Sequence, residues 1–182
     1  SINWNGKTIN FLDTPGFADF FGEVVSASKV VESVAFVLDA TSGVDLGTEN
    51  AWGLMQKEGI TGMFIVNKMK RENVDYEKAF QDIKNTLSEN ATLVQLPMGQ
   101  GPDFKGVIDL ISGKAYKYEG GARSEVEIPS EYKSKADSMK QELLESIASS
   151  DEALMEKFFD GKLSDEDISK GFLNAIKTGM LY

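Results

Sequence analysis

The chain has 182 residues, 41% of them apolar, which suits one large domain or two small ones. Its formal net charge of −10 argues against a broad surface that binds a nucleic-acid backbone. It contains no cysteine and no histidine, which excludes disulfide bonds, thiolate or histidine metal sites and histidine-based triads. No apolar run reaches the ~18 residues of a membrane span, and no signal peptide is visible.

The first predicted elements are two β-strands, Ser1–Trp4 and Lys7–Leu12, joined by a tight turn. Asn5-Gly6 between them is a strong hairpin signal, because both turn residues need positive φ. Gly6-Lys7-Thr8 imitates the end of the phosphate-binding loop Gly-x-x-x-x-Gly-Lys-Ser/Thr. Here, however, the first glycine position is Ser1, and a strand follows instead of a helix. We therefore assign no phosphate binding to this stretch.

An apolar strand then runs into Asp13-Thr14-Pro15-Gly16, and a helix is predicted over Asp19–Ser33. A carboxylate at the carboxyl end of a strand can hold a cation, directly or through water. A glycine there lets a phosphate approach the backbone amide, and the helix start behind it favours negative charge. An ordinary strand-to-helix turn explains the four residues equally well, so their interpretation depends on a second signal.

Strands and helices alternate up to about residue 90. The predicted strands are Val34–Leu38 and Gly62–Val66, and the predicted helices are Thr48–Lys57 and Asp75–Glu89. Such alternation predicts a parallel sheet with right-handed crossover connections. Ligands of such sheets bind at the carboxyl ends of the strands. Asp13 and Asn67 both follow strands, so we expect them to share one pocket.

From Thr92 onward, short strands are followed by helices, which indicates a separate α+β unit. The predicted strands are Thr92–Leu96, Gly106–Ile111, Lys114–Tyr118 and Val126–Ile128. The predicted helices are one capped by Ser130, a second over Asp151–Phe159 and a third over Ser164–Thr178. In the third helix, Ser164-x-x-Asp167 resembles a capping box.

The second signal is Asn67-Lys68-Met69, which lies two βα units after Asp13-Thr14-Pro15-Gly16. With Leu96-Pro97-Met98-Gly99, the run from Phe104 to Leu110 and Lys114-Ala115-Tyr116, it resembles bacterial elongation factor G over the whole chain. The resemblance implies an α/β fold: a partial P-loop GTPase domain with a mostly parallel sheet and flanking helices (residues 1–90), plus an inserted α+β subdomain (residues 91–182). It also implies a cytoplasmic translational GTPase that binds GTP or GDP with Mg²⁺ and acts on the ribosome in protein synthesis.

The resemblance also implies roles for individual residues. The turn Asp13-Thr14-Pro15-Gly16 would bind the nucleotide, with Asp13 holding Mg²⁺ through water and the Gly16 amide facing the γ-phosphate. Asn67 and Lys68 would line the guanine, with the Lys68 stem stacked on the base.

Two positions depart from the motifs of the family. The family has a histidine that positions the attacking water where this chain has Phe17, whose ring has no polar edge. The family also has an aspartate that pairs with guanine N–H groups where this chain has Lys70, which only donates. Losing such a charge-assisted hydrogen bond costs about 1.5–3 kcal/mol. These departures leave open an elongation factor G-like paralogue in a regulatory role, which binds nucleotide or a partner with little hydrolysis.

In the family, the phosphate-binding loop, the first switch and the last guanine motif lie before the position of Ser1 and after that of Tyr182. We therefore expect both ends to be cut from a longer chain. We also expect the isolated chain to hold no cofactor and to hydrolyse GTP poorly. An unrelated α/β nucleotide-binding enzyme is a third interpretation, and the match within the inserted subdomain argues against it.

Residues 142–167 hold nine carboxylates and only two lysines, which defines an acidic segment. A solvated helical surface explains such a segment in most proteins, and a docking face for a basic partner is the functional interpretation. Glu152, Glu156 and Asp160 follow one another at four-residue spacing, so a helix would place them on one face. The resemblance implies that this face meets the ribosomal stalk protein.

Overall fold

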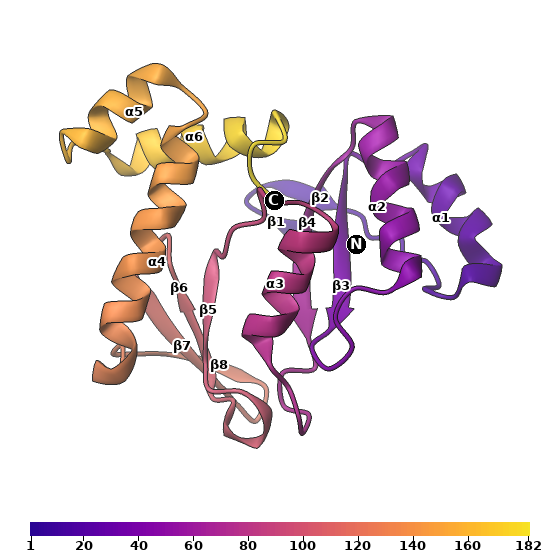
Figure 1. Ribbon diagram of the computed structural model, residues 1–182, viewed down its shortest axis with the longest axis horizontal. Helices are drawn as coiled ribbons and strands as arrows, with labels where there is room; N and C mark the ends of the chain where they lie inside the picture. Colours follow the sequence, from indigo (N-terminus) through magenta and orange to yellow (C-terminus); the bar gives the residue numbers. More distant parts are fainter.

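Eight strands form three separate sheets in the computed structural model, which describes residues 1–182 (Figure 1). The strands are β1 (Ile2–Trp4), β2 (Lys7–Ile9), β3 (Ser33–Asp39), β4 (Thr61–Asn67), β5 (Gln95–Met98), β6 (Gly106–Asp109), β7 (Lys114–Glu119) and β8 (Ala122–Val126). The helices are η1 (Ala18–Phe20), α1 (Phe21–Ser28), α2 (Leu46–Glu58), α3 (Tyr76–Thr86), η2 (Gly101–Asp103), α4 (Ser130–Ala148), α5 (Glu152–Phe159) and α6 (Asp165–Lys177). None of the helices is long and apolar enough to cross a membrane.

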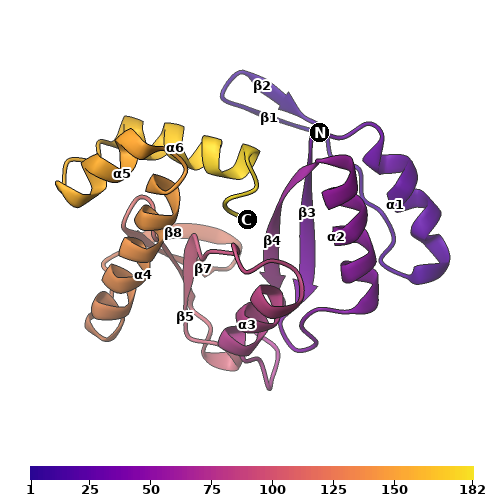
Figure 2. The same cartoon turned by 45° about the horizontal axis from the view of Figure 1, so that its top comes forward.

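The predicted N-terminal hairpin is confirmed. β1 and β2 pair antiparallel, and Asn5 and Gly6 take φ values of 46° and 73° in the turn. β2 ends at Ile9, however, so the expected extension of this strand to Leu12 is wrong. Figure 2 shows the hairpin standing apart from β3 and β4, with which it forms no sheet. Residues 10–12 therefore have no partner strand to continue the ladder.

β3 and β4 pair in parallel, as the alternating pattern predicts, and Asp39 lies opposite Asn67 at their carboxyl ends. One face of this pair carries Phe36 and Leu38, which pack with apolar residues of α2 and α3 into one hydrophobic cluster. The other face carries Val37 and Met63, whose side chains are largely exposed. The helices thus cover one face of the pair and leave an apolar face open.

Three helices of the first unit begin or end elsewhere than their sequence patterns predict. α3 ends at Thr86, three residues before the expected Glu89, and Asp75 is its N-cap. The helix expected over Asp19–Ser33 is a 3₁₀ turn followed by α1, and it stops at Ser28 because Ser33 pairs with Thr61 as the start of β3. α2 begins before the expected Thr48 because the side chain of Asp45 accepts a hydrogen bond from the Thr48 N–H at 2.7 Å and caps the helix.

The second unit is a four-stranded antiparallel sheet in the order β5-β6-β7-β8, packed against α4 (Figure 1). Its core includes Leu96, Ile108, Leu143 and Ile147, none more than 1% exposed. α5 and α6 pack on α4 at the end of the molecule away from α1 and α2 (Figure 2). The mixed architecture confirms the predicted α/β class with an additional α+β unit.

Strand positions in this second unit differ from the expected ones. β5 begins at Gln95, which pairs with Asp109, and not at Thr92; it ends at Met98 and not at Leu96, since Met98 pairs with Gly106. β8 begins at Ala122, directly after a two-glycine turn, and ends at Val126, where the expected strand begins. The helix α4 has Pro129 at its N-cap, so Ser130 is its first residue and not its cap.

The two hydrophobic clusters of the molecule correspond to the two halves of the chain only approximately. Ala91 is buried in the cluster of the β3–β4 unit, and Tyr76 of α3 packs against the cluster of the antiparallel unit. The division into residues 1–90 and 91–182 stays a prediction.

Candidate functional site at the carboxyl ends of β3 and β4

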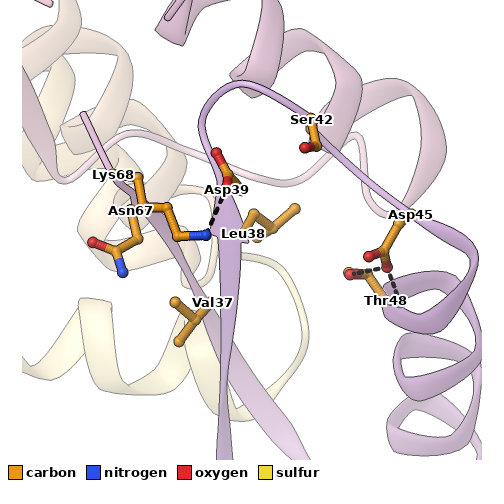
Figure 3. Close-up of a pocket in the computed structure, with 9 residues that line it drawn as sticks. Val37, Leu38, Asp39, Ser42, Asp45, Thr48, Asn67 and Lys68 are labelled. Carbon is orange, nitrogen blue, oxygen red and sulfur yellow. Dashed lines mark hydrogen bonds and ion pairs between the residues drawn. The ribbon is translucent and has the colours of Figure 1, made fainter. Parts of the chain in front are cut away.

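A cavity of about 270 Å³ opens at the carboxyl ends of the two parallel strands (Figure 3). Its lining residues come from β3, the loop after it, the start of α2 and the end of β4: Val37, Leu38, Asp39, Ser42, Gly43, Asp45, Thr48, Asn67 and Lys68. Most of these residues are polar, and they surround the place where ligands of parallel sheets bind.

Asp39 is the most heavily hydrogen-bonded side chain of this cavity. Its Oδ2 atom accepts from Lys68 Nζ at 2.8 Å and from Arg71 Nη1 at 2.9 Å. Its Oδ1 atom accepts from the N–H and the hydroxyl of Thr41 at 3.0 and 2.7 Å. The hydrogen bond from Lys68, followed by those from Thr41, holds the pKa of the Asp39 carboxyl well below its usual range. Asp39 is therefore a fixed negative charge at this edge of the sheet.

Asn67 and Lys68 reach the cavity through an unusual backbone. Lys68 has a φ of 61°, a left-handed conformation that is uncommon outside glycine. The Asn67 carbonyl accepts from the Ala40 N–H at 2.9 Å, and the Lys68 carbonyl accepts from the Arg71 N–H at 3.0 Å. The side chain of Asn67 makes no hydrogen bond within the chain, so its amide can bind a ligand.

The turn Asp13-Thr14-Pro15-Gly16 does not line this cavity. It lies nearby, since a Cβ atom on Gly47 of α2 would stand 3.1 Å from the Gly16 carbonyl oxygen. Asp13 is exposed, and its carboxylate accepts no hydrogen bond within the chain. The cavity therefore contains Asn67 but not Asp13, although the sequence predicts a pocket that both share, because the segment before Asp13 is not paired to β3.

Two further predicted residues also lie outside the cavity lining. The side chain of Phe17 is 77% exposed, between the Gly16 turn and η1. Lys70 is exposed in the turn that follows Lys68 and makes no ion pair. The structure brings together Asn67 and Lys68 and leaves Asp13, Phe17 and Lys70 on the surrounding surface.

Of the nine residues that line the cavity, the sequence analysis assigned only Asn67 and Lys68 to the site; the missed residues include Asp39, Asp45 and Thr48. Asp39 had a usable signal, because it directly follows the predicted strand Val34–Leu38 in the same way that Asn67 follows the predicted strand Gly62–Val66. Asp45 with Thr48 forms an Asp-x-x-Thr pattern that is typical of a helix start.

The acidic residues predicted to bind a partner lie on α5 and at its end. Glu152 and Glu156 are exposed and make no ion pair, whereas Asp160 pairs with Lys162 at 2.8 Å. Asp167 of α6 pairs with Lys157 at 2.7 Å, and the bonds from Lys157 and Ser164 lower the pKa of its carboxyl to about 2. The uncompensated charge of this face therefore resides on Glu152 and Glu156 more than on Asp160.

The parallel strand pair with polar residues at its carboxyl ends places the chain in the class of α/β proteins whose ligands bind at that edge of the sheet. The family model of the elongation factor Tu GTP binding domain matches residues 1–169. The chain belongs to this family.

Curated relatives and a solved structure extend the match over the whole chain. The chain is 37% identical to elongation factor G of Ureaplasma parvum serovar 3 and of Ureaplasma urealyticum serovar 10, over 98% of its own length and 27% of theirs. A crystal structure from Thermus thermophilus covers all of the chain with a TM-score of 0.90 and 34% identity, and 27% of that structure is matched. The chain thus spans about a quarter of the length of the relatives it matches.

The residues of the cavity fit a part of a guanine nucleotide site. Asn67 offers an unpaired amide, and the long apolar stem of Lys68 reaches the same cavity. For Mg²⁺, Asp13 supplies one exposed carboxylate, and no group of three or more acidic side chains could hold a metal ion by itself. Mg²⁺ at Asp13 would therefore take its other oxygen ligands from the nucleotide and from water.

Proposed function

We propose that the full-length protein containing this chain is an elongation factor G-like translational GTPase, which binds GTP or GDP with Mg²⁺ and acts on the ribosome as a cytoplasmic translation factor. The observation that carries the proposal is the cavity at the ends of β3 and β4, where Asn67 and Lys68 lie side by side. Its support is the 37% identity to elongation factor G along nearly the whole chain.

Each site residue has a proposed part in nucleotide binding. The Asn67 amide binds the edge of the base. The apolar stem of Lys68 covers a face of the base, and Asp39 accepts a hydrogen bond from the Lys68 ammonium group and so restrains that side chain. The Asp13 carboxylate holds Mg²⁺ through water, and the Gly16 amide faces the terminal phosphate. Hydrolysis would break the bond between the β- and γ-phosphates of GTP while a bond forms from the γ-phosphorus to the oxygen of a water molecule, and the part of this chain would be to hold the base and to help hold Mg²⁺.

Phe17 and Lys70 are where this site differs from the motifs of the family. The Phe17 ring can neither donate nor accept a hydrogen bond, so it cannot orient an attacking water, and we propose slow hydrolysis without the ribosome. A regulatory paralogue with little hydrolysis is the second candidate. The relatives that the chain matches do not favour it.

We further propose that the unit from Thr92 to Tyr182 presents the face of α5 to a basic partner on the ribosome, the stalk protein. The exposed, unpaired carboxylates of Glu152 and Glu156 support this proposal. Glu152 begins α5, where a negative charge is favourable, but the like charge of Glu156 four residues later opposes it, so mutual repulsion offsets what the pair contributes to the fold.

The test is calorimetric titration of the full-length protein with GTP, GDP and ATP in the presence of Mg²⁺, followed by GTP hydrolysis assays with and without ribosomes. We expect guanine nucleotide binding and hydrolysis that ribosomes accelerate. Residues 1–182 alone should bind GTP with no useful affinity, because most phosphate contacts of the family lie outside them. A full-length protein that binds neither GTP nor GDP would refute the proposal.

A further inference from the structure

The turn after β4, which carries the site residues Asn67 and Lys68, is held from two directions. From the side of β3, Asp39 binds Lys68 and Arg71 as described above. From the side of the antiparallel unit, the N–H of Gly101 in η2 donates to the Met69 carbonyl at 2.8 Å. Met69 directly follows Lys68, so this bond reaches the backbone of the site segment itself.

The loop of η2 depends on glycine for this approach. Gly101 is buried with a φ of +61°, and a Cβ atom there would stand 3.3 Å from the Arg71 carbonyl oxygen. Gly99, two residues earlier, has a φ of +79°, and its Cβ atom would stand 2.2 Å from the Asp103 carbonyl oxygen. A side chain at either position would strain the loop and displace it from the turn after β4.

The same loop is firmly attached to the antiparallel unit. It leaves β5 at Met98, which is 2% exposed, and the Lys105 N–H donates back to the Met98 carbonyl at 2.9 Å. The side-chain oxygen of Gln100 accepts the N–H of Tyr76, the first residue of α3, at 3.2 Å. The Tyr76 hydroxyl in turn accepts from Lys135 of α4. The loop therefore contacts both ends of the connection between β4 and α3.

We propose that Gln100 and Gly101 are positioning residues for the nucleotide site, through which the antiparallel unit sets the position of the segment Asn67–Lys70. A partner that displaces the antiparallel unit would then change the rate of nucleotide release. The proposal rests on the proposed function, since it takes this segment to face a guanine nucleotide.

The test compares two glycine substitutions in the full-length protein. Gly101→Ala introduces a methyl group at positive φ against the Arg71 carbonyl. Gly120→Ala, in the turn between β7 and β8, introduces the same strain at a φ of +57°, but no atom lies within 4 Å of the new Cβ. Both variants carry the backbone penalty of alanine at positive φ, and only the first disturbs the contact with the turn after β4.

Two measurements follow, the release rate of a fluorescent GDP analogue and hydrogen exchange of the peptide covering residues 68–76 in the nucleotide-free protein. We expect Gly101→Ala to release GDP about tenfold faster, which corresponds to a modest loss of binding free energy, and to exchange faster in this peptide. Gly120→Ala should match the wild type in both. Gln100→Ala, which introduces no backbone strain, should speed release and exchange in the same direction by a smaller factor.

Equal behaviour of Gly101→Ala and Gly120→Ala in both measurements would overturn the proposal. A full-length protein that binds no GDP analogue would refute the proposed function instead. In that case hydrogen exchange alone decides the structural coupling, and unchanged exchange in both Gly101→Ala and Gln100→Ala would reject it.

Discussion

At the scale of single residues, the site is organised by one carboxylate. Asp39 accepts hydrogen bonds from Lys68, Arg71 and Thr41, and these bonds stabilise its ionised form. The side chain of Lys68 is 46% exposed, so solvent screens this ion pair and its stabilising effect is modest. Its role is geometric, because it holds a long side chain in one orientation at the mouth of the cavity.

Replacing Lys68 with Ala should raise the pKa of the Asp39 carboxyl toward the ordinary value of about 4. Because the pKa of Asp39 is lower in the folded state than in the unfolded state, its ionised form stabilises the fold at pH values above the ordinary pKa. This stabilisation is lost as the pH falls below that value. The variant should therefore lose less stability between about pH 4 and pH 2 than the wild type. Carboxyl NMR titration and acid denaturation measure the two effects.

The control for this prediction is Lys29→Ala, which removes a comparable ion pair with Glu58 at 2.7 Å. It should leave the titration of Asp39 unchanged. An Asp39 titration that is the same in Lys68→Ala and the wild type would contradict the account.

Lys70 gives a second prediction at this scale, in the full-length protein. Lys70→Asp should strengthen guanine nucleotide binding and discrimination against ATP, because a carboxylate can accept the base N–H groups. A gain of about tenfold or more is expected, given about 1.5–3 kcal/mol for each charge-assisted hydrogen bond. Competitive titration with GTP and ATP measures it.

The matched control is Lys133→Asp, the same change at an exposed position of α4. It should leave nucleotide binding unchanged. If the wild-type protein already prefers GTP over ATP by several orders of magnitude, the interpretation of Lys70 is wrong.

At the scale of elements, capping residues at the helix ends determine where helices begin. α6 begins with a complete capping box, in which the Ser164 hydroxyl accepts the Asp167 N–H at 3.1 Å and the Asp167 carboxylate accepts the Ser164 N–H at 3.1 Å. Lys157 of α5 also binds the Asp167 carboxylate, so the box joins two helices.

Replacing Ser164 with Ala should lower the free energy of unfolding by about 1 kcal/mol, because an N–H of the first turn loses its acceptor. Ser169→Ala, in the middle of the same helix at an exposed position, should be nearly neutral because alanine is the better helix former. Urea denaturation of residues 1–182 measures both. Equal destabilisation by the two substitutions would count against the capping account.

At the scale of the whole molecule, charge and apolar surface are unevenly distributed. The acidic segment lies on the helices at one end, while the exposed apolar face of β3 and β4 lies on the other unit. Contacts such as the edge-to-face pair of Trp52 and Tyr182, with ring centroids 4.8 Å apart, connect the two units.

The acidic face leads to a prediction about association. The double substitution Glu152→Lys and Glu156→Lys should slow association with the basic domain of the ribosomal stalk protein more than it changes folding. Binding should also weaken as the salt concentration rises past about 0.15 M, where the Debye length is about 8 Å. NMR titration of the stalk domain at several salt concentrations measures both effects.

The charge-matched control is the pair Glu127→Lys and Glu131→Lys, two exposed positions of the same unit outside the acidic segment. It should reduce association less. Binding that is unchanged in the Glu152 and Glu156 variant would mean that this face is only a solvated surface.

Features whose cause is local could be predicted from the sequence. The Asn5-Gly6 hairpin and the capping box of Ser164 and Asp167 depend on residues within a few positions, and both are confirmed. The parallel pairing of β3 with β4 followed from the alternation of strands and helices, which restricts how the chain can connect them. The placement of Asn67 at a strand end came from the same pattern.

Features whose cause is pairing between distant residues were decided only by the tertiary structure. β5 runs from Gln95 to Met98 because these residues pair with Asp109 to Gly106, and β2 ends at Ile9 because no strand continues beside it. The ion pair of Asp39 with Lys68 and the bond from Gly101 to Met69 join residues about thirty positions apart. No periodicity within one segment reports such contacts, because they depend on which surfaces meet after the strands have paired.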